Sequence, residues 1–82
     1  MTPGLRRLYM PRRATVETGE YGIPRAVDGV AVEAVREEWV VEDRWWTPHP
    51  LGRHYFELAL ADGRNLVVFR NIVSRRWYRQ RG

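Results

Sequence analysis

Apolar and polar side chains alternate along much of the chain, and a period of two is typical of β-strands. In residues 55–61 apolar side chains recur at every second position, and residues 65–70 form a second alternating run. Three further segments are rich in valine or aromatic residues and have the composition of strands: 23–27, 30–35 and 76–80. The pattern therefore predicts five strands that follow one another in a meander.

Two Asp-Gly pairs lie between these strands and predict tight hairpins. Asp28-Gly29 separates the first two predicted strands, and Asp62-Gly63 separates the third from the fourth. Glycine accepts the positive φ that a type I′ turn requires, so Asp-Gly between strand formers is a strong hairpin signal. A loop is predicted at 47–52, where two prolines and a glycine interrupt the pattern.

A helix over residues 32–41 is the main alternative, because this segment contains good helix formers. The residues at its end favour a strand instead. Trp39, Val40 and Val41 are aromatic or β-branched, and no helix stop signal comes before Pro48. We therefore expect a long second strand that bends and contributes to both halves of the sheet.

The expected fold class is mainly β: a small antiparallel meander of about five strands, either a strongly curved sheet or a partly open barrel resembling SH3-like folds. This β domain is predicted to span residues 21–82. Residues 1–20 show neither the helical period of 3.6 nor a sustained alternation, and they contain several prolines and glycines. They therefore predict a flexible, loosely ordered basic arm. A small sheet either closes or leaves an edge open, and an open edge would allow a homodimer.

Composition narrows the class of protein. The 82 residues suffice for one small domain, and the absence of cysteine leaves the fold to depend on its apolar core. No apolar run is long enough to span a membrane, so we expect a cytoplasmic protein with no membrane partner. All 14 basic residues are arginine, whose planar guanidinium binds carboxylates and phosphates and stacks on rings.

The residues that catalysis requires are few. His49 and His54 are the only histidines, and neither has a nucleophile or a third metal ligand at a characteristic spacing, so a pair exposed on a loop is expected. A metal site formed by Glu38, Glu42 and His54 is the enzymatic alternative, but pairing of the carboxylates with arginines on neighbouring strands is favoured. We predict no catalytic residues, no metal and no cofactor.

Aromatic and arginine residues gather in the second half of the chain. The chain has a net charge of +4, and its arginines lie mainly in this half and at the N-terminal end. Because neighbouring residues of a strand point to opposite faces, one ring of Trp45-Trp46 and one of Trp77-Tyr78 should lie outside the core. Exposed rings and guanidinium groups can dock a protein or bind single-stranded nucleic acid. The predicted binding residues are Trp46, Arg53, Tyr55, Arg70, Arg75, Arg76, Tyr78 and Arg79.

The order of these residues resembles a known module. Trp45-Trp46, Tyr55-Phe56, Val68-Phe69-Arg70 and Arg76-Trp77-Tyr78 are similar to the WW, YF, VFR and RWF elements at the C-terminal end of ImuB-type proteins, over residues 36–80. Small stand-alone bacterial proteins of unknown function share the pattern. ImuB-type proteins are inactive relatives of Y-family DNA polymerases that act in bacterial lesion bypass, but this chain shows no polymerase-like core and no clamp-binding peptide.

The resemblance implies an adaptor that binds a protein partner within a DNA repair or translesion synthesis assembly. We therefore predict a non-enzymatic binding or adaptor module that acts through exposed aromatic and arginine side chains. Direct binding of single-stranded DNA is the first alternative. A small metal-dependent enzyme is the second.

Overall fold

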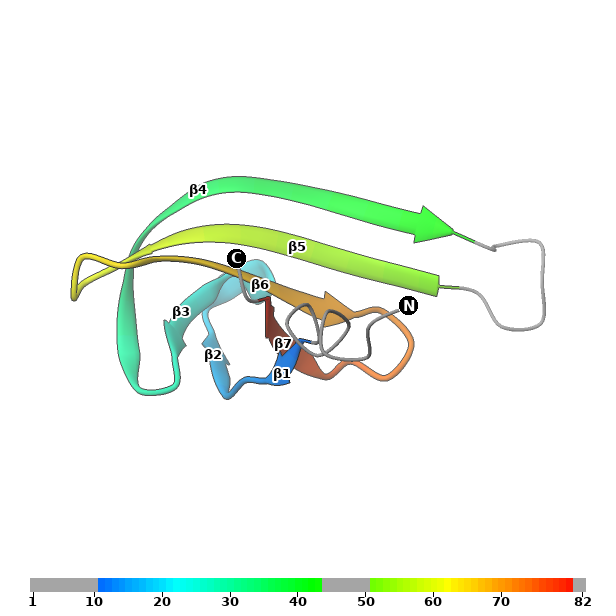
Figure 1. Ribbon diagram of the computed structural model, residues 1–82, viewed down its shortest axis with the longest axis horizontal. Coiled ribbons are helices and arrows are strands. Elements are labelled where there is room, and N and C mark those ends of the chain that lie inside the picture. Colours follow the sequence, from blue (N-terminus) through cyan, green and yellow to red (C-terminus); the bar gives the residue numbers. More distant parts are fainter. Residues whose placement is uncertain (1–10, 44–50, 81–82) are drawn as a thin grey trace, which may run out of the picture.

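The computed structural model describes residues 11–43 and 51–80, and within them the chain forms an antiparallel sheet with no α-helix (Figure 1). The mainly β fold class is confirmed. The strands follow the order β1-β7-β6-β5-β4-β3-β2 across the sheet. Their bounds are β1 Arg12–Arg13, β2 Val16–Thr18, β3 Pro24–Val27, β4 Val30–Asp43, β5 Leu51–Leu60, β6 Asn65–Asn71 and β7 Trp77–Gln80, with a short 3₁₀ turn at Glu20–Gly22.

A long bent ribbon of β4 and β5 forms the centre of the sheet. The two strands pair from Val32 opposite Leu60 to Asp43 opposite Leu51, and the register shifts twice, after Val32 and after Val35. Such bulges bend a strand and increase its twist. The expectation of one long strand that bends is therefore confirmed, and Figure 1 shows β4 curving over the rest of the sheet.

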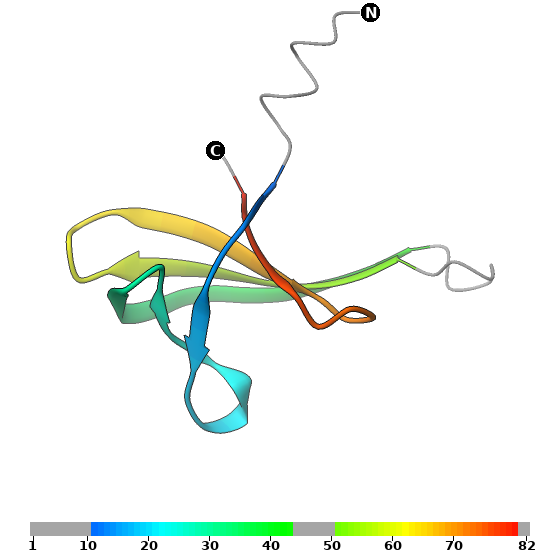
Figure 2. The ribbon, with the colours of Figure 1, turned by 90° about the horizontal axis from the view of Figure 1, so that it is seen from below.

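The two edge strands of the sheet are consecutive in the chain, which curls the sheet into an incomplete barrel. β1 pairs with β7 and β2 pairs with β3, while only Ala14 and Thr15 separate β1 from β2. Figure 2 shows this blue segment passing from β7 to β3. Backbone hydrogen bonds hold it at both sides, from Ala14 N–H to the Trp77 carbonyl (3.1 Å) and from Asp28 N–H to the Thr15 carbonyl (2.7 Å).

Asp28 joins the parts of the chain that meet at this closure. Its carboxylate accepts hydrogen bonds from the Thr15 N–H (2.8 Å) and from the Arg79 guanidinium (2.9 Å). Asp28 and Gly29 both have positive φ, 49° and 84°, and connect Val27 directly to Val30. The predicted type I′ turn is confirmed, and the same aspartate also ties the hairpin to β7.

The second Asp-Gly pair also forms a hairpin, but with a longer turn than the first. The Gly63 N–H donates to the Leu60 carbonyl (3.0 Å), and the Leu60 N–H donates to the Arg64 carbonyl (2.8 Å). Only Gly63 has positive φ, 90°. This is the three-residue hairpin loop in which a type I turn is followed by a left-handed glycine.

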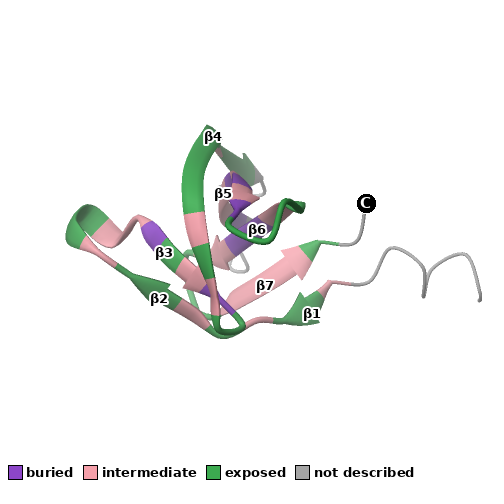
Figure 3. Ribbon diagram, turned by 90° about the vertical axis from the view of Figure 1, so that its left-hand side faces the viewer, coloured by how far each residue is buried: buried purple, intermediate pink, exposed green. Residues whose placement is uncertain are grey.

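The core lies inside the curl and is formed by one face of the central strands. Phe56, Leu58 and Leu60 alternate along β5 and are buried with Val68 of β6 and Val27 of β3 (Figure 3). Partly buried residues from β2, β4, β6, β7 and two connecting segments pack against this core: Ala14, Val16, Ile23, Val30, Val32, Leu66 and Trp77. Along these strands, alternate residues therefore face the core.

Three expectations from the sequence need correction. Residues 12–18 of the predicted loose arm form β1, the link Ala14-Thr15 and β2, because Ala14 and Val16 pack against the core. Residues 1–10 lie outside the described part. The sheet consequently has seven strands in the described residues instead of five. Leu51 and Gly52 belong to β5 and not to a loop, while residues 44–50 are not described.

Candidate binding surface

A row of aromatic side chains crosses four strands on the outer face of the sheet, opposite the core. Trp39 of β4 is in register with Tyr55 of β5, Tyr55 with Phe69 of β6, and Phe69 with Tyr78 of β7. Tyr55, Phe69 and Tyr78 are each next to a core-facing residue of their strand, so alternation places them on the outer face, and Trp39 aligns with them through its pairing with Tyr55. We call these four residues the aromatic ladder.

Neighbouring rings of the aromatic ladder contact one another, and the first and last pairs are stacked. Centroids are 5.1 Å apart for Trp39 and Tyr55, 5.0 Å for Tyr55 and Phe69, and 5.3 Å for Phe69 and Tyr78. The first pair is parallel within 2° and the last is inclined by 22°, whereas the rings of Tyr55 and Phe69 are tilted by 41°. Rings that stand side by side on a sheet and face each other turn their edges, not their faces, toward solvent.

Two arginines cover part of the aromatic ladder. The Arg53 guanidinium lies 4.6 Å from the centre of the Phe69 ring and donates to the Tyr55 hydroxyl at 3.2 Å. Arg13, opposite Tyr78 in the register of β1 and β7, lies 5.8 Å from the centre of that ring. Phe69 is consequently only 2% exposed although it lies outside the core, and the Arg53 Nε is buried without a hydrogen-bond partner in the described structure.

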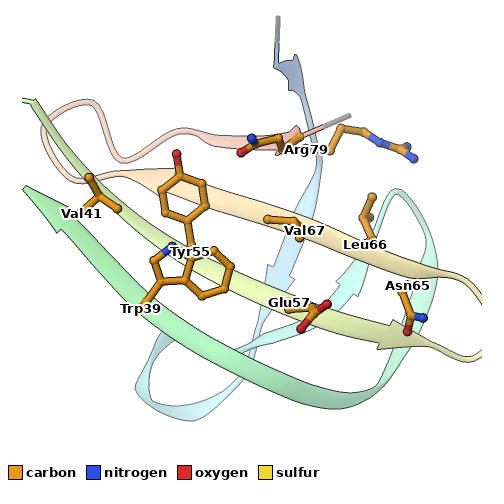
Figure 4. Close-up of a pocket in the computed structure, with 9 residues that line it drawn as sticks. Trp39, Val41, Tyr55, Glu57, Asn65, Leu66, Val67 and Arg79 are labelled. Carbon is orange, nitrogen blue, oxygen red and sulfur yellow. The ribbon is translucent and has the colours of Figure 1, made fainter. Parts of the chain in front are cut away.

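An open hollow of about 720 Å³ adjoins the Trp39 end of the aromatic ladder (Figure 4). The rings of Trp39 and Tyr55 form one wall, and the Glu57 carboxylate projects beside them. In the register of β4 and β5, Glu57 is directly opposite Glu37, and like charges in this arrangement repel. The remaining residues that line the hollow are Val41, Asn65, Leu66, Val67, Arg79 and Gln80.

The predicted binding residues do not form a single site. Tyr55, Tyr78 and Arg53 belong to the aromatic ladder or cover it, as described above. Arg79 borders the hollow, but its guanidinium is engaged with Asp28. Arg70 is in register with Trp77 and its guanidinium lies 5.8 Å from the centre of that core-packing ring.

The other predicted binding residues lie away from the aromatic ladder. Arg75 and Arg76 are exposed in the connection between β6 and β7, where Arg75 has a left-handed φ of 64°. Trp46 lies outside the described residues. The split of Trp77 inward and Tyr78 outward follows the expected alternation.

Trp39, Phe69 and Arg13 are part of the surface but absent from the predicted binding set. Trp39 and Phe69 stand out in the sequence as aromatic, but only the pairing register shows that they align with Tyr55 and Tyr78. Arg13 lies in a segment expected to be loose. Its position depends on the long-range pairing of β1 with β7, for which the local sequence carries no signal.

The residues of the metal alternative are only partly assembled. His54 lies within β5, not in a loop, with its Nε2 2.5 Å from the Glu38 carboxylate and its ring stacked 4.4 Å from Phe56. Glu38 therefore pairs with a histidine in place of the expected arginine. Glu42 is opposite Gly52. In residues 11–43 and 51–80, no three His, Asp or Glu side chains gather in a metal-binding arrangement.

Comparisons with family models, with curated proteins and with solved structures found no match to this chain. The resemblance to the ImuB-type module therefore stays a prediction from the sequence. In the described part of the chain, no helix has both the length and the apolar character needed to cross a membrane.

Proposed function

We propose that this protein is a non-enzymatic adaptor that docks a protein partner on the aromatic ladder and its two covering arginines. The observation that carries the proposal is a row of four rings with two guanidinium groups, held on the sheet face opposite the core. Aromatic residues and arginine are the residue types that concentrate binding energy in protein interfaces.

The stacking geometry favours a protein over bases as the ligand. Single-stranded nucleic acid binds by placing each base on the face of a ring. In the first and last pairs of the aromatic ladder the faces of neighbouring rings are turned toward one another, at 2° and 22°, and the Arg53 guanidinium lies over Phe69. The partly exposed rings of Trp39, Tyr55 and Tyr78, with Arg53 covering Phe69 between them, suit packing by side chains of a protein.

The hollow beside Trp39 supports the same choice. It combines apolar walls with the Glu57 carboxylate, which has an unfavourable like-charged neighbour in Glu37. A lysine or arginine of a partner would relieve this repulsion, whereas a phosphate would add to it. The hollow is therefore suited to a basic side chain.

We further propose that the partner belongs to a bacterial DNA repair or translesion synthesis assembly in the cytoplasm. This part rests on the ordered motifs that resemble the ImuB-type module. Of the motif residues, Tyr55, Phe69 and Tyr78 lie in the aromatic ladder, while Phe56 and Val68 lie in the core.

Site-specific photo-crosslinking tests the docking surface. Benzoylphenylalanine in place of Gln80, an exposed residue that lines the hollow, is expected to form an adduct with protein in cells. The same probe at Glu17, exposed on β2, is the matched control and should form none. Tyr55→Ala should abolish the Gln80 adduct.

Equal adducts at the two positions would refute the docking surface. An adduct at Gln80 that nuclease removes and protease does not would assign the surface to nucleic acid instead. Direct binding of single-stranded DNA remains the second candidate, because Arg13 and Arg53 place positive charge on the ladder of a chain with net charge +4.

A further inference from the structure

The strand β4 has a long outer edge. On one side β4 pairs with β5 along most of its length, but on the other side β3 pairs only with Val30 and Ala31. Within residues 11–43 and 51–80, no strand lies beside the rest of that side, and Figure 1 shows β4 at the margin of the sheet. The backbone N–H and C=O groups of such an edge can pair with an added strand.

The part of this edge from Glu37 to Asp43 has the regularity that strand addition requires. Both register shifts of β4 come earlier, and from Glu37 opposite Glu57 onward each residue is paired in sequence with β5. Val40 and Val41 are 52% and 40% exposed there, on opposite faces of the strand. A strand added here would cover apolar surface on both faces.

Charge indicates what kind of strand fits. Glu37, Glu38 and Glu42 are exposed along this edge, and Arg36 is the basic residue of β4. The chain as a whole has a net charge of +4, so β4 is an acidic strand in a basic protein. A second copy of β4 laid antiparallel would bring these carboxylates toward each other, which disfavours a homodimer at this edge.

We propose that the edge from Glu37 to Asp43 binds an extended, basic segment of a partner protein as an additional antiparallel strand. The inference rests on the proposed docking function and specifies the chemistry of the partner. Trp39 and Val41 share the ladder face, whereas Glu38, Val40 and Glu42 share the opposite face. The bound segment accordingly alternates, with apolar residues beside Trp39 and basic residues beside Glu42 and beside Glu38, whose carboxylate also contacts His54.

The test uses a synthetic probe with this alternation, the capped peptide Arg-Val-Arg-Val-Arg-Val-Arg, titrated into the full chain labelled with ¹⁵N. Amide resonances of residues 37–42 should shift, and those of β2 should not. The same peptide with alternate backbone nitrogens methylated keeps its charge but cannot complete the ladder of hydrogen bonds, so it should bind at least tenfold more weakly. Equal binding of both peptides would overturn the inference.

Two variants of β4 provide a matched pair. Glu42→Gln removes a carboxylate from the regular edge and should weaken peptide binding about two- to fivefold, the range for an exposed ion pair. Glu33→Gln removes an exposed carboxylate at the first register shift of β4, outside the regular edge, and should leave binding unchanged. If both variants weakened peptide binding equally, the binding would depend only on the net charge of the protein, and this result would contradict strand addition.

Two further outcomes separate this inference from the proposed function. A protein adduct at Gln80 together with no peptide binding would overturn strand addition and leave the aromatic ladder as the docking surface. Sedimentation showing a dimer that the peptide dissociates would assign the edge to a second copy, and would likewise overturn the inference.

Discussion

At the scale of single residues, Asp28 both forms a tight turn and binds two other segments of the chain. It adopts a left-handed backbone of φ 49°, and its carboxylate also binds the Thr15 N–H and the Arg79 guanidinium. Three segments that are distant in sequence therefore meet at one side chain. Aspartate and asparagine tolerate this backbone better than other residues with a side chain.

Replacement of Asp28 should separate these contributions. Asp28→Ala loses both hydrogen bonds and the left-handed preference, and we expect the free energy of unfolding to fall by about 1 to 3 kcal/mol. Asp28→Asn keeps an acceptor for Thr15 and the turn preference, so it should lose less than half as much. Urea unfolding measures both; equal losses would show that the ion pair with Arg79 dominates.

Arg53 shows how one side chain can serve both stability and binding. Arg53→Ala uncovers Phe69, and we expect it to lower the free energy of unfolding by about 1 kcal/mol through lost cation–π contact and lost cover by its stem. Arg53→Lys keeps the charge and the apolar stem but loses the planar stacking. Its free energy of unfolding should therefore lie between those of the unchanged protein and of Arg53→Ala.

Thermal unfolding followed by circular dichroism is the measurement for the Arg53 variants. Arg76→Ala is the control, since Arg76 is exposed beyond the sheet and should change stability by no more than about 0.5 kcal/mol. A loss for Arg76→Ala as large as that for Arg53→Ala would contradict the role assigned to Arg53.

At the scale of elements, β5 combines the core and the docking surface in one strand. Its even-numbered residues Phe56, Leu58 and Leu60 are buried, and its odd-numbered residues Tyr55 and Glu57 face the ladder and the hollow. The same alternation that builds the core therefore also builds the candidate site.

Substitutions on the two faces of β5 should have different effects. Leu58 is 0% exposed, and Leu58→Ala should lower the free energy of unfolding by about 2 to 5 kcal/mol. Tyr55 is partly exposed, and Tyr55→Ala should cost about 1 to 3 kcal/mol of stability, because its ring contacts both Trp39 and Phe69, and should abolish the crosslink at Gln80. A Tyr55→Ala protein as unstable as Leu58→Ala would show that the ladder is structural.

The elements that were predictable from the sequence are those with a local signal. The alternation in β5 and β6 and the turn at Asp28-Gly29 follow from side-chain periodicity and from backbone preference. The strands β1 and β2 have only two and three residues and pair with β7 and β3 far along the chain, so their sequence alone does not identify them. For the aromatic ladder, the sequence identifies the aromatic residues but not their alignment, because the pairing register of the strands determines which rings are neighbours.

At the scale of the whole molecule, charge is distributed across the sheet. The acidic strand β4 lies toward one margin, while β1 and β7 at the other carry Arg12, Arg13 and Arg79. The aromatic ladder spans the distance between them. A partner that covers the ladder would consequently meet Glu37 at one end and Arg13 at the other, and these opposite charges would orient it.

The central claim is that the aromatic ladder, in which each inner ring has a ring neighbour on both sides, docks a protein and does not stack bases, not even on its terminal ring Trp39. Fluorescence anisotropy of labelled oligothymidine with the intact chain and with Trp39→Ala tests it most directly. The account predicts only weak, salt-sensitive binding that Trp39→Ala leaves unchanged. A loss of about 1 to 3 kcal/mol in DNA affinity on Trp39→Ala, at unchanged thermal stability, is the cost of removing a stacking ring and would contradict the account.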